Sequence, residues 1–210
     1  YNGGGKKFSG YTLNNGISNM YANREMRFYA SIGFSRRFWE CASTDENMWK
    51  NQTITYHLGG NADRNDLGNN SVDYNLTGYV ITKFIHPEDA HKGNGARVLE
   101  KAYGIIRYAE ILLSYVEAMN NLTSPHSVSM ISEFGENTEY QVSRDLLEMS
   151  YNFNLVRFRA GLPGISDQEL REPETVQKLL ERERMVEFLY ENRRYFDVRR
   201  WGIYEIVDAE

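Results

Sequence analysis

The chain has 210 residues, with 24 Lys and Arg against 29 Asp and Glu, and its formal net charge is −5. This length allows one ordinary domain with a sizeable core, or two small ones, and the acidic balance argues against a nucleic-acid partner, which favours a basic face. The single cysteine, Cys41, excludes an internal disulfide, and the four histidines form no HxxxH or HxH pair, so we expect neither a closed metal site nor a cofactor.

Residues 1–100 are rich in Gly, Asn, Ser and Thr. Turn signals such as Asn14-Asn15-Gly16 interrupt this half repeatedly. Between the turns, residues 27–34 and 78–85 alternate between apolar and polar side chains, which predicts short strands. We expect the half to be mostly loop, with two or three short strands and little helix.

Residues 101–210 have helical periodicity instead. Apolar residues at i, i+3, i+4 and i+7 spacing predict a helix over 104–121. Its inward side is expected to carry Ile105, Tyr108, Ala109, Leu112, Val116 and Met119. A second helix is predicted over about 140–158 and a third from Pro173, a favourable first-turn residue, to about Asn192. Residues 122–139 contain Pro125, Gly135 and many small polar residues, and are predicted to form a surface loop.

The most charged stretch is ERERMVEFLYENRRYFDVRRWG, residues 181–202, with five acidic and six basic side chains. Opposite charges three or four residues apart can meet on one helical face. Exposed pairs of this kind contribute only about 0.3–0.5 kcal/mol each, but here aromatic and aliphatic residues lie between them. We therefore expect a half-buried lattice of ion pairs between helix and loops, rather than a phosphate-binding surface or a catalytic acid/base pair.

This stretch resembles the C-terminal helix motif of the SusD/RagB family. The matching residues are Glu183, Arg184, Glu187, Glu191, Arg194, Asp197, Arg200 and Trp201. Four further segments are similar to family segments and occur in the family's order: 23–32, 77–84, 107–120 and 153–163. Departures are modest, with Met26 in place of the usual Pro and Asn192 in place of the common Gly.

The resemblance implies a mostly α fold: a tetratricopeptide-like helical scaffold onto which irregular loops and a few short strands are grafted. Residues 1–210 would form the C-terminal part, with 1–100 as the loop-rich, ligand-facing portion and 101–210 as the helical portion. The chain begins at Tyr1 rather than Met, and no signal peptide is visible. We therefore expect a fragment or processed product that lacks the N-terminal half of the family fold.

Family members are surface-exposed lipoproteins of the outer membrane that capture nutrients, mostly glycans. The resemblance therefore implies non-catalytic glycan binding and delivery to a SusC-like TonB-dependent transporter. The lipid anchor would lie on the missing N-terminal part. Binding residues would come mainly from loops between the two upstream segments, residues 34–77.

Those loops contain groups that suit a sugar, because aromatic rings stack on its C–H faces while amides bind its hydroxyls. We predict that Trp39, Trp49, Tyr56 and Asn51 contact the ligand. Trp39 could equally belong to the core, whereas Trp49 favours an exposed platform. Asp63, Asn65 and Asp66 also suggest a calcium loop, but their spacing does not fit an EF-hand, and no metal is expected.

Three alternatives remain at this point. The same scaffold could bind peptides, which a deep charged groove would favour. It could be a helical interaction module without a small ligand, which buried tryptophans at 39 and 49 would favour. A glycosidase would need two carboxylates about 5–10 Å apart in a cleft, and the adjacent Asp45 and Glu46 would point apart, so we expect no enzymatic activity.

Overall fold

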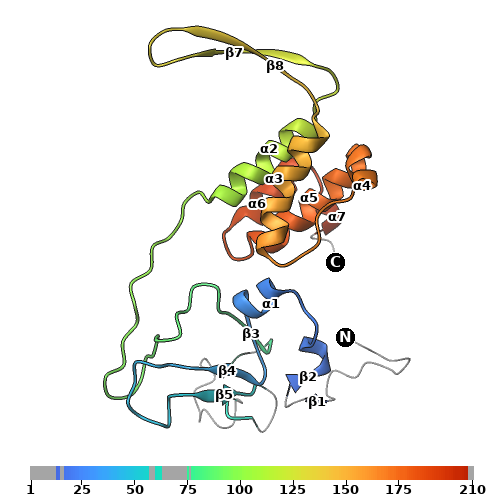
Figure 1. Cartoon of the computed structure of the whole chain (residues 1–210). Helices are drawn as coiled ribbons and strands as arrows, with labels where there is room; N and C mark the ends of the chain where they lie inside the picture. The colour runs from blue at the N-terminus through green and yellow to red at the C-terminus, as the bar shows by residue number, and fades with distance from the viewer. Residues whose placement is uncertain (1–12, 15–16, 57–59, 63–74, 76, 208–210) are drawn as a thin grey trace, which may run out of the picture. The chain divides into compact units, whose positions relative to one another are not determined.

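The computed structural model describes residues 13–14, 17–56, 60–62, 75 and 77–207. The chain divides into two compact units, residues 1–103 and 104–210, each of which is described by itself (Figure 1). Together the elements give a mostly helical fold with irregular loops and a few short strands, as predicted. Among the described residues, no helix has both the length and the apolar character needed to cross a membrane.

The described residues of the first unit form loops that three small antiparallel strand pairs hold together. The pairs are β1 (Leu13–Asn14) with β2 (Ile17–Ser18), β3 (Ile32–Phe34) with β6 (Tyr79–Ile81), and β4 (Arg37–Trp39) with β5 (Gln52–Ile54). A short 3₁₀ helix, η1 (Asn19–Tyr21), follows β2. Such short strands leave most backbone positions in loops, which is what a Gly- and Asn-rich sequence favours.

The strand predicted over 27–34 is wrong for most of its length. Residues Met26–Ser31 form the helix α1, and only β3 is extended. The reason is tertiary packing: the Phe28 ring lies 5.3 Å from the Phe34 ring, and the Tyr21 ring lies 4.5 Å from Phe34. One helical turn before the strand brings these rings together, and their burial overrides the alternating pattern.

The second unit packs its helices around one core (Figure 1). Its helices are α2 (Tyr108–Asn120), α3 (Leu146–Arg159), α4 (Asp167–Arg171), α5 (Pro173–Glu187), α6 (Arg193–Arg200) and α7 (Tyr204–Val207). The fully buried side chains Leu113, Val116, Met149, Val176 and Leu180 come from α2, α3 and α5. Asp145 caps α3 by accepting hydrogen bonds from the backbone of Leu147 and Glu148, and a Ser166/Glu169 capping box begins α4.

Two details of the predicted helices are corrected. Ile105 and Tyr108 are 78% and 70% exposed, because α2 begins only at Tyr108 and its buried side starts at Ala109. The third helix ends at Glu187 rather than near Asn192. The chain then turns through Tyr190 and Asn192, both with positive φ, before α6 begins. This turn brings α6 back beside α5, with which it forms the Arg184–Asp197 ion pair.

The predicted loop over 122–139 is instead a β-hairpin, which also includes residues assigned to the start of the second helix. Its strands are β7 (His126–Ile131) and β8 (Asn137–Val142), and it projects beyond the ends of α2 and α3 (Figure 1). Pairing places Val128 opposite Tyr140 on one face and Ser129 opposite Glu139 on the other. The alternation of polar and apolar residues in HSVSMI indicates a strand. The Pro and Gly on either side favour a loop and hide this pattern.

Candidate functional site

An aromatic cavity of about 540 Å³ lies in the first unit. The described residues that line it are Trp39, Cys41, Met48, Trp49, Gln52, Ile54, Tyr56, Asn61, Val80, Ile81 and Ile85. Three of the four predicted ligand contacts, Trp39, Trp49 and Tyr56, are therefore brought together. The fourth, Asn51, does not line the cavity.

The pairing of β4 with β5 decides which side chains face this cavity. Trp39 lies opposite Gln52 in the ladder. Ile54, two residues further along β5, shares their face, because side chains in a strand alternate. Phe38 and Thr53 point to the other face and are exposed. A shift of the register by one residue would replace the cavity wall with the opposite face.

Trp39 is a half-buried wall residue whose ring packs against β3 and β6. A Cβ on Gly33 would lie 2.8 Å from Trp39 Cζ2 and 2.5 Å from Val80 Cγ2, so only glycine leaves room for the ring. The indole Nε1 is buried and has no hydrogen-bond partner within the described part of the chain. The guanidinium of Arg37 lies 5.7 Å from the ring centroid.

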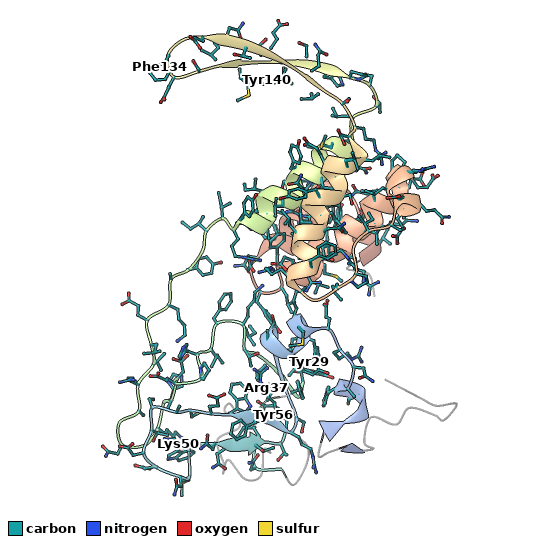
Figure 2. The ribbon with its side chains drawn as sticks, viewed as in Figure 1. Tyr29, Arg37, Lys50, Tyr56, Phe134 and Tyr140 are labelled. Atoms are coloured by element: carbon teal, nitrogen blue, oxygen red, sulfur yellow. The ribbon has the colours of Figure 1, made fainter. Side chains whose placement is uncertain are left out.

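Arg37, which lies two residues before Trp39 on β4 and opposite Ile54, is itself held in place by hydrogen bonds. One of its terminal nitrogens donates to the carbonyls of Tyr29 and Ile32, at 2.6 and 2.8 Å, and to Thr82 Oγ1 at 3.0 Å. Figure 2 shows Arg37 between α1, which carries Tyr29, and the strands. Burial lowers the pKa of Arg37, which the nearby Tyr56 partly offsets. The cation thus serves to anchor β4 to α1.

Trp49 is the exposed member of the aromatic set, at 38%. It lies in the turn after β4, where its backbone N–H donates to the carbonyl of Glu46 at 3.0 Å. Lys92 Nζ lies 5.1 Å from the centroid of its ring, a cation–π contact. The carboxylate of Glu46 accepts from the backbone N–H of Asn94 at 2.9 Å, so the loop around residue 93 is tied to this turn.

Tyr56 and Asn51 lie at the two ends of β5. The Tyr56 N–H donates to Ser35 Oγ at 3.3 Å, and burial raises the pKa of its phenol, although Arg37 acts in the opposite direction. Asn51 has φ = 57° in the turn that begins the strand, and its N–H donates to the carbonyl of Glu40 at 2.9 Å. Its side chain is exposed, so its role as a ligand contact stays a prediction.

The two amides on the cavity wall are both held by the backbone. Asn61 Oδ1 accepts from Thr55 N and Oγ1, at 2.8 and 3.0 Å, and Asn61 Nδ2 donates to the carbonyl of Thr53 at 2.9 Å. Gln52 Nε2 donates to the carbonyls of Asn47 and Lys50, each at 2.8 Å. Asn61 is thus committed to the turn, whereas the carbonyl oxygen of Gln52 accepts no hydrogen bond from the described residues.

The sequence-based selection missed several wall residues. Gln52 and Ile54 belong to the predicted loop region, but its strand register was not known. Val80, Ile81 and Ile85 lie beyond residue 77, the last residue of that region. The alternating segment 78–85 was the available signal, since a strand next to the loop contributes a wall.

No metal site accompanies the cavity in the described ranges, which contain no group of three or more His, Cys, Asp or Glu side chains able to hold an ion. The residues considered for calcium, Asp63, Asn65 and Asp66, lie outside the described residues. The nearby acidic side chains are occupied in other ways. Asp89, for example, forms an ion pair with Lys101 at 2.6 Å and accepts from the backbone of His86 and Leu99.

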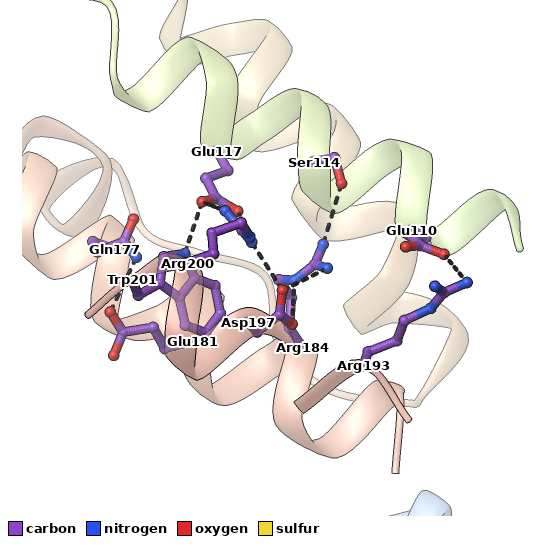
Figure 3. A network of polar contacts seen from close by, with 10 residues as sticks. All are labelled: Glu110, Ser114, Glu117, Gln177, Glu181, Arg184, Arg193, Asp197, Arg200 and Trp201. Carbon is purple, nitrogen blue, oxygen red and sulfur yellow. Dashed lines mark hydrogen bonds and ion pairs between the residues drawn. The ribbon is translucent and has the colours of Figure 1, made fainter. Parts of the chain in front are cut away.

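The charged stretch of the second unit forms a lattice of ion pairs, both within itself and with other helices (Figure 3). Arg184 pairs with Asp197, and Arg200 bridges Glu117 and Asp197. Trp201 Nε1 donates to Glu117 at 2.8 Å. Burial raises the pKa of Glu117, but the bonds from Arg200 and Trp201 outweigh this and lower it.

A cleft of about 500 Å³ runs along this lattice. Its charged walls include Arg184, Asp197 and Arg200, whose charges are satisfied by one another and by Glu117. A ligand would have to break buried pairs to use them, which costs about 3–5 kcal/mol for each partner left alone. The lattice is therefore structural, and the aromatic cavity is the better candidate site.

A family model and five solved protein chains match this chain. The sequence model of the SusD family matches residues 1–208. The structure resembles a SusD-like protein from Bacteroides fragilis, at 28% identity and a TM-score of 0.62 over 89% of this chain. It also resembles the protein BT4246, at 22% identity and a TM-score of 0.62 over 94% of the chain, a likeness in fold alone. The chain spans 30% and 29% of the lengths of those proteins. No curated protein matches.

Proposed function

Because the chain belongs to the SusD family, we propose that it is part of a cell-surface protein that binds glycans for nutrient uptake. The observation that carries the proposal is the gathering of Trp39, Trp49 and Tyr56 around one cavity. Aromatic rings offer the flat apolar surface that the C–H face of a sugar needs, and the amides beside them can bind hydroxyls. The role is binding, without catalysis.

The whole protein would act at the outer membrane. By membership of the family, we propose that it is a surface-exposed lipoprotein, anchored through its N-terminal part, and that it delivers the glycan to a SusC-like TonB-dependent transporter. An affinity-tagged copy expressed in its native cells should co-purify with such a transporter, identified by mass spectrometry. Recovery of the tagged protein without any outer-membrane transporter would count against the partnership but not against glycan binding.

A ligand-free interaction module is less well supported, because Trp49 remains 38% exposed rather than buried. A single exposed tryptophan is ordinary on a protein surface. An exposed tryptophan beside a half-buried one and a tyrosine, all lining one cavity, supports the proposal of a ligand site.

Affinity electrophoresis tests the proposal directly. The intact protein would be run through gels that contain each of a panel of soluble polysaccharides, beside the Trp39→Ala and Trp49→Ala variants. Phe38→Ala is the matched control, since Phe38 is exposed on the opposite face of β4 and does not line this cavity. We expect one glycan to retard the wild type and the control but not the folded tryptophan variants. Absence of retardation by every glycan would refute the proposal.

A further inference from the structure

The described part of the aromatic cavity's wall is uncharged. None of the described residues that line it is Asp, Glu, Lys, Arg or His. Its weakly acidic groups are the Cys41 thiol and the Tyr56 phenol, and burial raises the pKa of both, so both stay neutral at pH 7. An anionic group entering the cavity would lose hydration without gaining a partner of opposite charge among these lining residues.

The cations nearest to the aromatic rings are already engaged. Arg37 donates to two backbone carbonyls and to Thr82, and it lines a different cavity. Lys92 lies over the Trp49 ring, whose π face attracts it. Neither residue is among the described residues that line the aromatic cavity, so neither is placed to pair with a carboxylate or sulfate inside it.

Gln52 provides one fixed acceptor on this wall. Both hydrogens of its Nε2 are used by the carbonyls of Asn47 and Lys50, each at 2.8 Å. The reverse orientation of the amide would place Oε1 against two carbonyl oxygens, so the assignment of nitrogen and oxygen is determined. Oε1 accepts no hydrogen bond from the described residues, and Gln52 lies directly opposite Trp39 in the β4–β5 ladder.

We propose that the aromatic cavity selects neutral glycans over acidic ones, and that Gln52 Oε1 accepts a hydrogen bond from a sugar hydroxyl beside the Trp39 ring. This inference rests on the proposed function, because it requires the cavity to be the glycan site. Trp39 supplies the surface for the apolar face of the sugar, and Gln52 supplies the acceptor at its edge. A ligand hydroxyl, which donates without carrying charge, matches both groups.

Three forms of one polysaccharide distinguish the effect of ligand charge on binding from the effect of ligand bulk. The probes are a neutral polysaccharide that retards the intact protein, its carboxymethyl derivative, and its O-methyl derivative at the same degree of substitution. The O-methyl form adds bulk without charge and removes hydroxyl donors. We expect the parent to bind best, the O-methyl form less well, and the carboxymethyl form at least tenfold more weakly. Retardation by the parent should not change with added salt, since no ion pair is involved.

Gln52→Met tests the acceptor. The loss of one neutral hydrogen bond should weaken binding of the parent about threefold to tenfold. If the bond is to a hydroxyl, the variant should show little further loss with the O-methyl form. The methylation penalty is the factor by which O-methylation of the polysaccharide weakens its binding. A purely structural role for Gln52 would leave this penalty the same in the variant as in the wild type. Gln52→Lys is the second variant, because its ammonium can still donate to the carbonyls of Asn47 and Lys50 but cannot accept.

The outcomes are distinguishable. Carboxymethyl derivatives that bind as tightly as the parent would overturn the selection for neutral glycans and leave glycan binding intact. Gln52 variants that bind like the wild type, or that retain the full methylation penalty, would overturn the role of Gln52. Failure of every glycan to retard the wild type would refute the proposed function, and this inference with it. Unfolding curves for each variant identify losses that come from misfolding.

Discussion

Arg184 and Asp197 form a buried, two-bond ion pair across the turn that joins α5 to α6. Arg184 Nε lies 2.8 Å from Asp197 Oδ2, and the second terminal nitrogen lies 3.0 Å from Oδ1. Both side chains are 5% exposed. This pair explains why the third predicted helix is interrupted: the chain must reverse direction after Glu187 to bring the carboxylate back to the guanidinium.

Removal of this carboxylate should therefore destabilise the helical unit strongly. Asp197→Ala leaves the Arg184 cation buried without its main partner, and we expect a loss of about 3–5 kcal/mol in the free energy of unfolding. Urea denaturation followed by circular dichroism measures it. Glu139→Gln, on the exposed face of the hairpin, is the control and should change stability by less than about 0.5 kcal/mol. A loss below about 1 kcal/mol for Asp197→Ala would show that the pair is not buried in solution.

Gly33→Ala should disturb the aromatic cavity from behind. The new Cβ would lie within 2.8 Å of Trp39 Cζ2 and 2.5 Å of Val80 Cγ2, and overpacking of this kind costs about 1–3 kcal/mol. We expect a shifted tryptophan emission spectrum and weaker glycan retardation. Gly104→Ala is a matched exchange, since its nearest neighbour, Arg107 Cγ, would be 3.4 Å away. An unchanged spectrum in Gly33→Ala would mean that Trp39 does not pack on β3.

The loop that carries Asp89 should weaken in acid. Burial raises the pKa of Asp89, but bonds from Lys101 and from the backbone of His86 and Leu99 outweigh it and bring the pKa to about 2. Because this lies below the ordinary value of 3.8, the carboxylate contributes its stability in full above about pH 4 and loses it as the pH falls towards 2. The protection factor of the Leu99 amide, which corrects the exchange rate for the pH dependence of intrinsic exchange, should fall over that range.

Lys101→Met provides the comparison for Asp89. Loss of the ammonium removes one of the interactions that favour the ionised carboxylate, so the loss of protection should begin at a higher pH. Asp89→Asn should abolish the pH dependence of the protection factor between pH 4 and 2 at this amide. The same acid profile in Asp89→Asn and the wild type would assign the effect to other groups.

Replacement of residues 126–142 by a short Gly-Ser turn should leave the helical unit folded. The core cluster contains no residue of this hairpin, and every residue of β7 is exposed. His126 and Val142 pair at its base, so two or three residues can close the gap. We expect an unfolding free energy within about 1 kcal/mol of the wild type. Loss of the helical signal in circular dichroism would show that the hairpin supports the core.

The sequence predicted the helices better than the links between them. Periodic apolar residues located α2, α3 and α5, because each buries one stripe against the same core. The break after Glu187 depends on Asp197 meeting Arg184, a contact that the spacing of residues along one helix cannot reveal. The hairpin was missed because its alternation is short and lies between the turn residues Pro125 and Gly135.

For the cavity, the sequence indicated which types of residue line it, but it did not reveal the strand register that brings them together. Trp39, Trp49 and Tyr56 were chosen as aromatics in a loop-rich region, and they line one cavity. Asn51 and Gln52 are neighbouring amides, and the sequence alone gives no basis for choosing between them as ligand contacts. Only the pairing of β4 with β5 places Gln52 opposite Trp39 and leaves Asn51 in the turn, because a register shift of one residue exchanges the faces.

The two tryptophans should respond differently to truncation. Trp39 is half-buried against Gly33, so Trp39→Ala should cost roughly 2–4 kcal/mol of stability through lost packing. Trp49 is 38% exposed and lies in a turn, so Trp49→Ala should cost less than about 1 kcal/mol yet weaken glycan binding by about tenfold or more. Urea denaturation and affinity electrophoresis on the same samples separate the effects. A Trp49→Ala variant that loses stability but binds normally would place Trp49 in the core and leave Trp39 and Tyr56 as the platform.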